Sequence, residues 1–175
     1  MTNQILITGC GTFIPPEVVD NETLVKAYNA HVKEHNQEYS EEIAVGDKAA
    51  LKASSADFIK NASGIEERRV MEASGIVNPR RLRPELKDRK PDELSYQAEM
   101  GLAAAKNALN QANKSANDVG MLISACSNYE RPYPSLAIEV QEALGITGFA
   151  FDMNVACSSV PFAIRLAYNS LITQP

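Results

Sequence analysis

Short apolar runs alternate with amphipathic stretches along the chain, and this pattern predicts alternating strands and helices. Runs rich in β-branched or aromatic residues, typical of buried strands, cover 4–11, 65–71, 119–126 and 149–153. Elsewhere apolar residues recur every three or four positions, which is the spacing of one helical face. These segments predict helices over 22–37, 41–51, 55–64, 92–109, 135–144 and 158–171.

Capping residues set the expected helix boundaries. We expect Asn21, Asp92 and Ser135 to cap helix starts, because their side chains accept hydrogen bonds from unpaired N–H groups of the first turn. Gly64 and Gly145 suit helix ends, where a left-handed residue is needed.

Alternation of strands and helices favours an α/β fold with a mostly parallel sheet and helices on both faces. Ligands in such sheets bind at the carboxyl ends of the strands. The last helix, 158–171, is apolar nearly all round and is therefore expected to be buried on most sides. No strand follows it to pair next, so we expect part of the fold to lie outside this sequence.

Cys157 is the main candidate for chemistry. It lies where the run Phe151–Val155 ends in a turn and the last predicted helix begins. Unpaired N–H groups and the helix dipole favour negative charge at such a place, so a thiol there loses its proton more readily. The alternative is a small buried side chain, the usual fate of a free cysteine.

Composition is that of a globular protein with one sizeable core, since 45% of the 175 residues are hydrophobic and 22% are charged. Three widely spaced cysteines (Cys10, Cys126 and Cys157) do not suggest a disulfide scaffold and fit a reducing compartment. No signal peptide or membrane span is apparent. We therefore expect a cytoplasmic protein that does not enter a membrane.

Positive charge is concentrated in one segment. Residues 68–90 carry a charge of +5, within a formal net charge of −5 for the whole chain. The loop 73–91 is interpreted either as a docking surface for a phosphate-bearing ligand or an acidic protein, or as a solvated excursion punctuated by prolines. Nucleic acid is not an expected partner, because no aromatic residues interleave with the charges.

The chain resembles β-ketoacyl-acyl carrier protein synthase III of the thiolase superfamily along nearly its whole length. The resemblance rests on ordered motifs, which are 7–15 (ITGCGTFIP), 21–24 (NETL), 63–68 (SGIEER), 133–135 (YPS), 144–146 (LGI) and 152–158 (DMNVACS). It implies the amino-terminal half, residues 1–175, of a layered αβαβα fold. The context of Cys157 and Tyr133 is more similar to members that accept medium-chain primers and form β-ketodecanoyl products.

The resemblance implies an acyltransferase of fatty acid biosynthesis that needs no metal or separate cofactor. Cys157 would attack the thioester of an acyl-CoA primer, and the acyl-enzyme would then condense with malonyl-acyl carrier protein. The backbone N–H of Cys157 would help to bind the oxyanion. The expected partners are therefore acyl-CoA, an acyl carrier protein and a second copy of the protein.

Two aromatic residues are carried over by the resemblance as substrate-binding residues. Phe58 matches an aromatic residue, usually tryptophan, that stacks on the adenine of CoA, and Ala62 falls where a basic residue often holds the nucleotide. Tyr133 matches an aromatic residue that lines the acyl pocket near the dimer interface. Each aromatic could instead have a purely structural role in the core or a hinge.

The decarboxylating His and Asn of the family belong to a second half, in this or another polypeptide, that the sequence does not contain. His31 and His35 are not substitutes, and without further ligands they indicate a solvated helix face rather than a metal site. Two alternatives to the condensing enzyme stay open. One is a non-catalytic thiolase-fold scaffold or partner-binding subunit, and the other is a related thioester hydrolase or thiolase.

Overall fold

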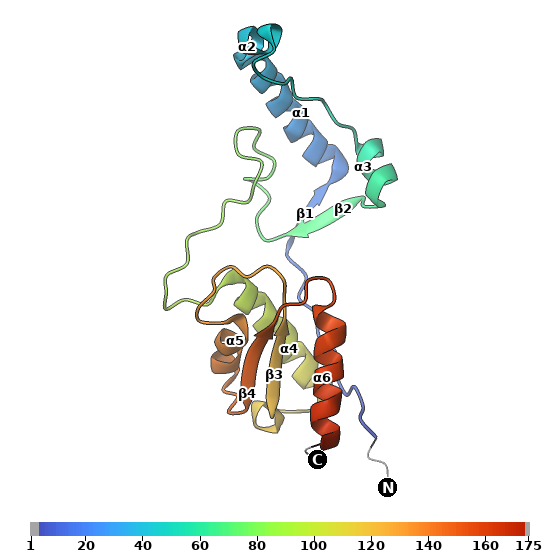
Figure 1. The fold of residues 1–175 in the computed structure, drawn as a ribbon, viewed down its shortest axis with the longest axis vertical. Coiled ribbons are helices and arrows are strands. Elements are labelled where there is room, and N and C mark those ends of the chain that lie inside the picture. The colour runs from blue at the N-terminus through green and yellow to red at the C-terminus, as the bar shows by residue number, and fades with distance from the viewer. Residues whose placement is uncertain (1–3, 174–175) are drawn as a thin grey trace. The chain divides into compact units, whose positions relative to one another are not determined.

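The computed structural model describes residues 4–173, which form two compact units (Figure 1). One unit is Ile14–Asp88. The other combines the segment before Ile14 with the chain from Arg89 onward, and it contains Cys157.

A strand–helix–strand unit forms the centre of the Cys157-containing unit. Strands β3 (Met121–Ala125) and β4 (Phe149–Met153) pair in parallel, with Met121 opposite Phe149. Helix α5 (Leu136–Leu144) connects them and contacts both strands (Figure 1). Because parallel strands require a crossover, the helix predicted between these two apolar runs determines their direction.

Two longer helices flank this centre. Helix α4 (Tyr96–Ala112) packs on α5, and α6 (Ser159–Thr173) lies beside β3 (Figure 1). A short 3-10 turn, Ala116–Asp118, leads from α4 toward β3. Ala98 of α4 and Ala137 of α5 are fully buried, so the small side chains allow these helices to approach closely.

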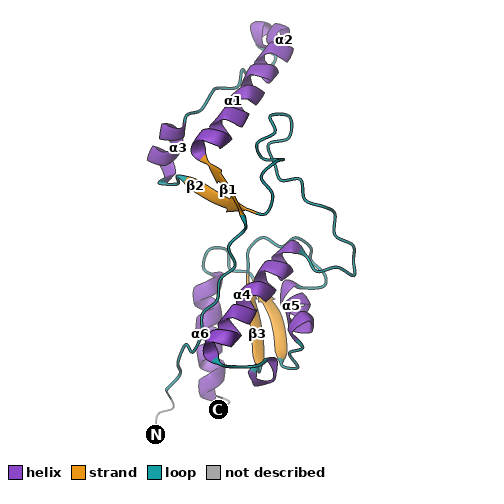
Figure 2. Ribbon diagram, turned by 180° about the vertical axis from the view of Figure 1, so that it is seen from behind, coloured by secondary structure: helices purple, strands orange, loops and turns teal. Residues whose placement is uncertain are grey.

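The unit Ile14–Asp88 contains an antiparallel pair, β1 (Glu17–Asp20) and β2 (Glu67–Val70), with Glu17 opposite Val70 (Figure 2). Its three helices are α1 (Asn21–Glu38), α2 (Ser40–Val45) and α3 (Ala56–Ser63). The packing between the first strand and α1 buries Val19, Val25 and Ala27.

Most helix boundaries follow the expected capping chemistry. Ser135 accepts a hydrogen bond from the N–H of Ile138, and Gly64 and Gly145 end their helices in the left-handed conformation. Two predicted caps are wrong by a few residues. Asp20 rather than Asn21 caps α1, and Ser95 rather than Asp92 caps α4, because those side chains reach the third N–H of their helices.

The mostly parallel sheet is confirmed only for β3 and β4. The prediction of a strand over 4–11 is wrong, since the described part of this segment runs along α4 without regular structure. The backbone N–H and carbonyl groups of a strand need hydrogen-bond partners on a neighbouring strand. In this segment, side chains of α4 provide hydrogen bonds instead. Asn107 donates to the carbonyl of Thr12, and Gln111 accepts from the N–H of Cys10. Gly9 and Gly11 permit the close approach, because a Cβ at either would clash with carbonyls of α4.

The expectation that α6 is buried on most sides is also wrong. Along most of its length apolar side chains are exposed, and they include Val160, Phe162, Ile164, Tyr168, Leu171 and Ile172. The physical reason is that β3 is the main element of this chain packed against α6. A helix that is apolar on all its faces is expected to be buried in the complete protein or assembly. The sequence pattern does not show which polypeptide packs against those faces.

Candidate functional site

Cys157 lies on a tight elbow between β4 and α6. The preceding residue, Ala156, has a positive φ of 48°, and the Cys157 side chain is exposed. The helix starts two residues after the sulfur, at Ser159. A non-glycine residue in the left-handed region is uncommon and marks a turn that the surrounding structure enforces.

Hydrogen bonds from the first residue of α6 enforce this turn. Ser159 is 3% exposed, and its hydroxyl accepts from the N–H of Val155 at 2.8 Å and donates to the carbonyl of Ala156 at 2.8 Å. The backbone adds a bond from the Ser158 N–H to the Val155 carbonyl at 3.0 Å. Together these bonds hold the thiol in front of the first turn of α6, the positive end of the helix.

We expect a Ser159→Ala substitution to loosen the elbow. The N–H of Val155 and the carbonyl of Ala156 would lose these part-buried bonds, and a net loss of about 1 kcal/mol for each bond is expected. Urea denaturation of the complete protein measures this loss, and Ser158→Ala, at the exposed neighbouring position, is the control with an expected change under about 0.5 kcal/mol. Equal stability of the two variants would contradict the role assigned to Ser159.

Tyr133 lies at the same edge of the parallel pair as Cys157. The loop 127–134 follows the carboxyl end of β3, and the elbow follows the carboxyl end of β4. Tyr133 precedes a cis peptide bond to Pro134, and its side chain is 87% exposed. The structure therefore brings these two predicted site residues to one edge of the sheet, where ligands of α/β folds bind.

A buried ion pair anchors the Tyr133 loop to α5. Glu139 is 4% exposed, and both its oxygens accept from the Arg131 guanidinium, at 3.1 and 2.5 Å. Glu139 also accepts from the N–H of Ser95 at 2.7 Å, and Arg131 donates to the carbonyl of Glu93 at 2.6 Å. Burial alone would raise the pKa of Glu139, but the bonds from Arg131 and Ser95 outweigh it and hold that pKa below its ordinary value.

The sheet itself holds the start of α5. Asp152, a charged residue within the apolar strand β4, accepts from the N–H groups of Leu136 at 3.0 Å and Ala137 at 2.7 Å. A carboxylate at a helix N-terminus accepts hydrogen bonds from the unpaired N–H groups of the first turn, and its negative charge is stabilised by the positive end of the helix dipole. This contact links the strand that leads to Cys157 with the helix that follows Tyr133.

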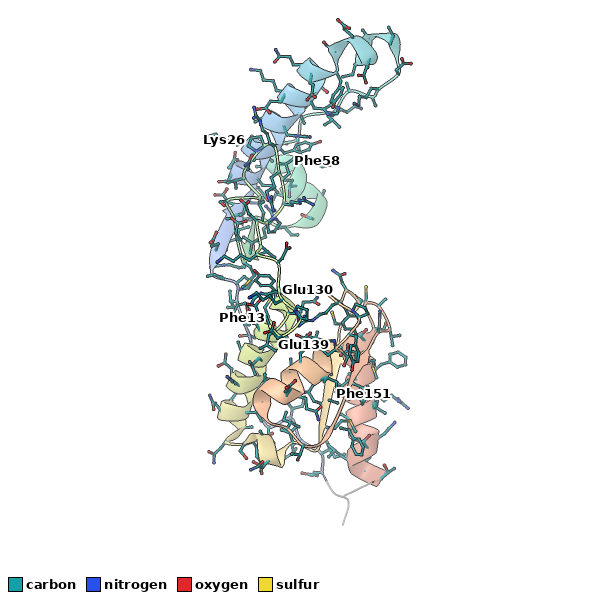
Figure 3. The ribbon with its side chains drawn as sticks, turned by 90° about the vertical axis from the view of Figure 1, so that its left-hand side faces the viewer. Phe13, Lys26, Phe58, Glu130, Glu139 and Phe151 are labelled. Carbon is teal, nitrogen blue, oxygen red and sulfur yellow. The ribbon has the colours of Figure 1, made fainter. Side chains whose placement is uncertain are left out.

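Phe58 belongs to the other unit, Ile14–Asp88, and is labelled in Figure 3. Its side chain on α3 is 66% exposed and lines a cavity of about 810 Å³. The lining of this cavity also includes Tyr28, Lys52, Ser55, Ile59 and Leu82. Ala62 lies on the same helix as Phe58.

The loop 73–91 contains no helix or strand (Figure 2), and internal hydrogen bonds hold it. The carboxylate of Glu72 closes it, accepting from the N–H of Glu85 at 2.5 Å and of Gly75 at 3.0 Å. A Cβ on Gly75 would lie 2.4 Å from the carbonyl of Arg83, so only glycine fits this crossing.

Loop closure is expected to be pH-dependent. The N–H of Glu85, followed by the hydroxyl of Ser74, lowers the pKa of Glu72 from 4.5 to about 2. A lowered pKa means that the ionised form stabilises the folded loop, so this contribution is complete above pH 4.5 and is lost as the pH falls toward 2. The protection factors of amide hydrogen exchange at Gly75 and Glu85, which correct for the intrinsic pH dependence of exchange, should fall over this range. In Glu72→Gln the exchange should be fast already at pH 6, and slow exchange there would contradict the assignment.

The two histidines of α1 have structural contacts. His31 Nδ1 lies 2.9 Å from the carbonyl of Pro79, and the ring of His35 lies 4.8 Å from that of Tyr39. Both side chains are half-buried, so the predicted solvated face is wrong in detail. Between residues 4 and 173, no three His, Cys, Asp or Glu side chains gather as metal ligands do. In the same range no helix is long and apolar enough to cross a bilayer.

Comparison with known proteins identifies the family. No protein-family model matches the chain. The chain is 47% identical over 149 residues to a β-ketodecanoyl-acyl carrier protein synthase of Pseudomonas aeruginosa, and this match covers 85% of this chain and 43% of that protein. The chain belongs to the β-ketoacyl-acyl carrier protein synthase III family. A synthase III of Roseobacter denitrificans is 30% identical, with 98% of this chain and 40% of that protein covered.

The fold agrees with this family, and the chain corresponds to the amino-terminal half of its members. The crystal structure of 3-oxoacyl-acyl carrier protein synthase III from Aquifex aeolicus matches with a TM-score of 0.64 and 24% identity, over 95% of this chain and 40% of that one. Xanthomonas campestris OleA with bound lauric acid and lauroyl-CoA matches with a TM-score of 0.65 and 17% identity, over 99% of this chain and 41% of that one. The thiolase-like fold is thus confirmed.

Sequence reasoning missed three polar residues that shape the candidate site around Cys157 and Tyr133. They are Arg131, Glu139 and Asp152, and each holds the loop or helix next to the carboxyl edge of β3 and β4. A signal existed for two of them, because a charged residue inside the apolar runs of β4 and α5 requires a partner. The sequence offered no means of naming that partner.

Proposed function

We propose that the complete protein containing this chain condenses an acyl-CoA primer with malonyl-acyl carrier protein in fatty acid biosynthesis, through an acyl group carried on Cys157. The observation that carries the proposal is the 47% identity to a β-ketodecanoyl-acyl carrier protein synthase. The chain spans 43% of that relative's length, so the proposal concerns the complete protein.

The geometry of the elbow supports Cys157 as the nucleophile. Its side chain is exposed in front of α6, whose first turn has unpaired N–H groups. Negative charge on the sulfur, and on the carbonyl oxygen of a bound thioester, would lie at the positive end of the helix dipole. A buried structural cysteine would need neither the exposure nor the strained turn.

Two transfers make up the proposed reaction. In the first, the sulfur of Cys157 bonds to the thioester carbon, the carbon–sulfur bond to CoA breaks, and CoA leaves with the electron pair and takes a proton. In the second, the malonyl group loses carbon dioxide and its carbanion attacks the acyl carbonyl, which returns the thiolate of Cys157. By the family resemblance, the His and Asn that assist decarboxylation belong to the second half of the protein.

The proposal includes a homodimer in the cytoplasm. The dimer follows from the family resemblance, and three free cysteines, Cys10, Cys126 and Cys157, support a reducing compartment. Tyr133 would line the acyl pocket, because it projects from an anchored loop at the edge of the sheet that carries Cys157. Sedimentation equilibrium of the complete protein would test the dimer.

Intact-mass analysis tests the proposed function. After incubation of the complete protein with octanoyl-CoA, we expect the mass of one octanoyl group on each subunit, and peptide mapping should assign it to Cys157. Acylation of Cys10 or Cys126 would contradict the proposal. Absence of acylation would favour a non-catalytic thiolase-fold subunit, and release of free octanoate instead of condensation would favour a thioester hydrolase.

A further inference from the structure

The position of the Tyr133 ring depends on the backbone around it rather than on packing of the ring itself. The side chain is 87% exposed, so few neighbours constrain it directly. The backbone before Tyr133 and the backbone after it are each held by side chains of other elements. The place of the ring therefore depends on two anchors, one before Tyr133 and one after it.

The first anchor joins the loop 127–134 to the start of α4. Gln97 accepts from the N–H of Glu130 at 2.7 Å. The carboxylate of Glu130, which is labelled in Figure 3, accepts from the N–H of Tyr96 at 2.8 Å. The buried ion pair of this loop adds an attachment to α5. The chain is therefore held close to Tyr133 on its amino-terminal side.

The second anchor is the carboxylate of Asp152, which lies on β4 and holds the start of α5. It accepts from the N–H groups of Leu136 at 3.0 Å and of Ala137 at 2.7 Å. The hydroxyl of Ser135 accepts from the next N–H of the helix, that of Ile138. These are N–H groups that a helix start leaves unpaired. Because Asp152 belongs to a different element, its bonds fix the start of α5 relative to β4, which the cap from Ser135 does not do.

Asp152 thereby connects the two predicted site residues at this edge of the sheet. β4 leads directly into the elbow that carries Cys157, and the hydroxyl of Ser159 fixes that elbow. On the other side, Tyr133 lies just before the cap of α5. The separation of the Cys157 sulfur from the Tyr133 ring is therefore set along a short path that passes through one carboxylate.

We propose that Asp152 is a positioning residue that determines the length of the acyl primer by fixing where Tyr133 lies relative to Cys157. The inference rests on the proposed function, in which Cys157 carries the acyl group and Tyr133 lines its pocket. A pocket wall at a fixed distance from the sulfur accepts chains up to one length, and a longer chain must displace the wall or bend. One methylene in an apolar pocket changes kcat/KM by roughly 10–200-fold, and a wall that moves loses part of this discrimination.

An Asp152→Asn variant of the complete protein tests the inference. Asparagine keeps one acceptor oxygen and replaces the other with an NH₂ group, which cannot accept from an N–H. The measurement is kcat/KM for β-ketoacyl product with hexanoyl-, octanoyl-, decanoyl- and dodecanoyl-CoA. The ratio between the best primer of the unmodified protein and the primer two carbons longer should fall by about 5-fold or more in the variant. A ratio that stays within about 1.5-fold would overturn the inference.

Asp118→Asn is the matched control. The carboxylate of Asp118 also accepts from a backbone N–H, that of Ser115 at 2.8 Å. Asp118 precedes β3 and so lies at the opposite end of the parallel strands from Cys157. The substitution removes the same charge and the same kind of bond, and the primer ratio should stay within about 1.5-fold. An equal change of the ratio in this control would indicate a general loss of rigidity, and the inference would be wrong.

Two further measurements separate a positioning role from a structural one. Alkylation of Cys157 by iodoacetamide involves no acyl chain, so Asp152→Asn should leave its rate within about 2-fold. A larger loss would mean that the substitution disturbs the nucleophile itself, against the inference. In a Tyr133→Ala background, Asp152→Asn should change the primer ratio by less than about 1.5-fold, because the carboxylate acts through the ring. A full effect in that background would also contradict it.

A second variant keeps the inference testable if Asp152→Asn does not fold. Glu130→Ala weakens the first anchor at an exposed position of the loop, so the fold should tolerate it. It should lower the same primer ratio by about 2-fold or more, and an unchanged ratio would show that anchoring of Tyr133 does not set the primer length.

Failure of the inference can be distinguished from failure of the proposed function. If the unmodified protein transfers no acyl group from any of the acyl-CoA primers, the proposed function is wrong and the inference with it. If the unmodified protein prefers one primer length and Asp152→Asn keeps that preference, only the inference is wrong.

Discussion

A Cys157→Ala variant of the complete protein is expected to lose condensation of acyl-CoA with malonyl-acyl carrier protein by on the order of 10⁴-fold or more. Removal of the sulfur removes the only proposed carrier of the acyl group, and no other group can replace a covalent intermediate. Because the side chain is exposed and the residue is already in a turn, the fold should tolerate the change. Steady-state formation of the β-ketoacyl product is the measurement.

Two controls make this result specific. Cys10→Ala removes another exposed thiol and should leave the rate within about 2-fold of the unmodified protein, since only the backbone of Cys10 is engaged by Gln111. The melting temperature of Cys157→Ala should match that of the unmodified protein. Retained condensation at Cys157→Ala would refute the nucleophile, whereas a large loss of thermal stability would show that Cys157 has a structural role.

The elbow that carries Cys157 could be predicted from the sequence because its main signal is local. An apolar strand followed by a small-residue turn and an apolar helix predicts an elbow, and in the structure Cys157 lies on that elbow between β4 and α6. The strained φ of Ala156 and the buried hydroxyl of Ser159 were not predictable. They depend on how the turn closes in space, and neither alanine nor serine is a distinctive residue at such a place.

Non-local pairing explains the errors in the fold. The residues 4–11 have the composition of a buried strand, but strand pairing depends on a neighbour elsewhere in the structure, and side chains of α4 satisfy part of this segment instead. The burial of α6 also depends on neighbours distant in the sequence. The sequence therefore predicted its apolar surface correctly but did not predict that this surface is exposed. Local capping chemistry was predicted well at Gly64, Ser135 and Gly145, since it involves residues only a few positions apart.

The ion pair between Arg131 and Glu139 could not be predicted either, although it accounts for the second large effect that we expect. A Glu139→Ala variant should lose roughly 3–5 kcal/mol of stability, because it leaves the Arg131 guanidinium, 20% exposed, without its bidentate partner and the Ser95 N–H without its acceptor. Glu139, which is labelled in Figure 3, lies in the first turn of α5 and accepts from Arg131 of the Tyr133 loop and from the N–H of Ser95 at the start of α4. The destabilising effect of Glu139→Ala should therefore extend beyond α5. Urea denaturation of the complete protein measures the loss of stability.

A double-mutant cycle distinguishes the ion pair from simple loss of packing. Arg131→Ala combined with Glu139→Ala should destabilise the protein by less than the sum of the single variants, since neither charge is then left buried alone. Glu142→Ala, three residues further along the same helix and exposed, should change stability by under about 0.5 kcal/mol. Additive single effects would show that the two residues act independently. A strong coupling, accompanied by altered primer-length preference in Arg131→Ala, would mean that the pair sets the position of Tyr133 as well as the stability of the loop.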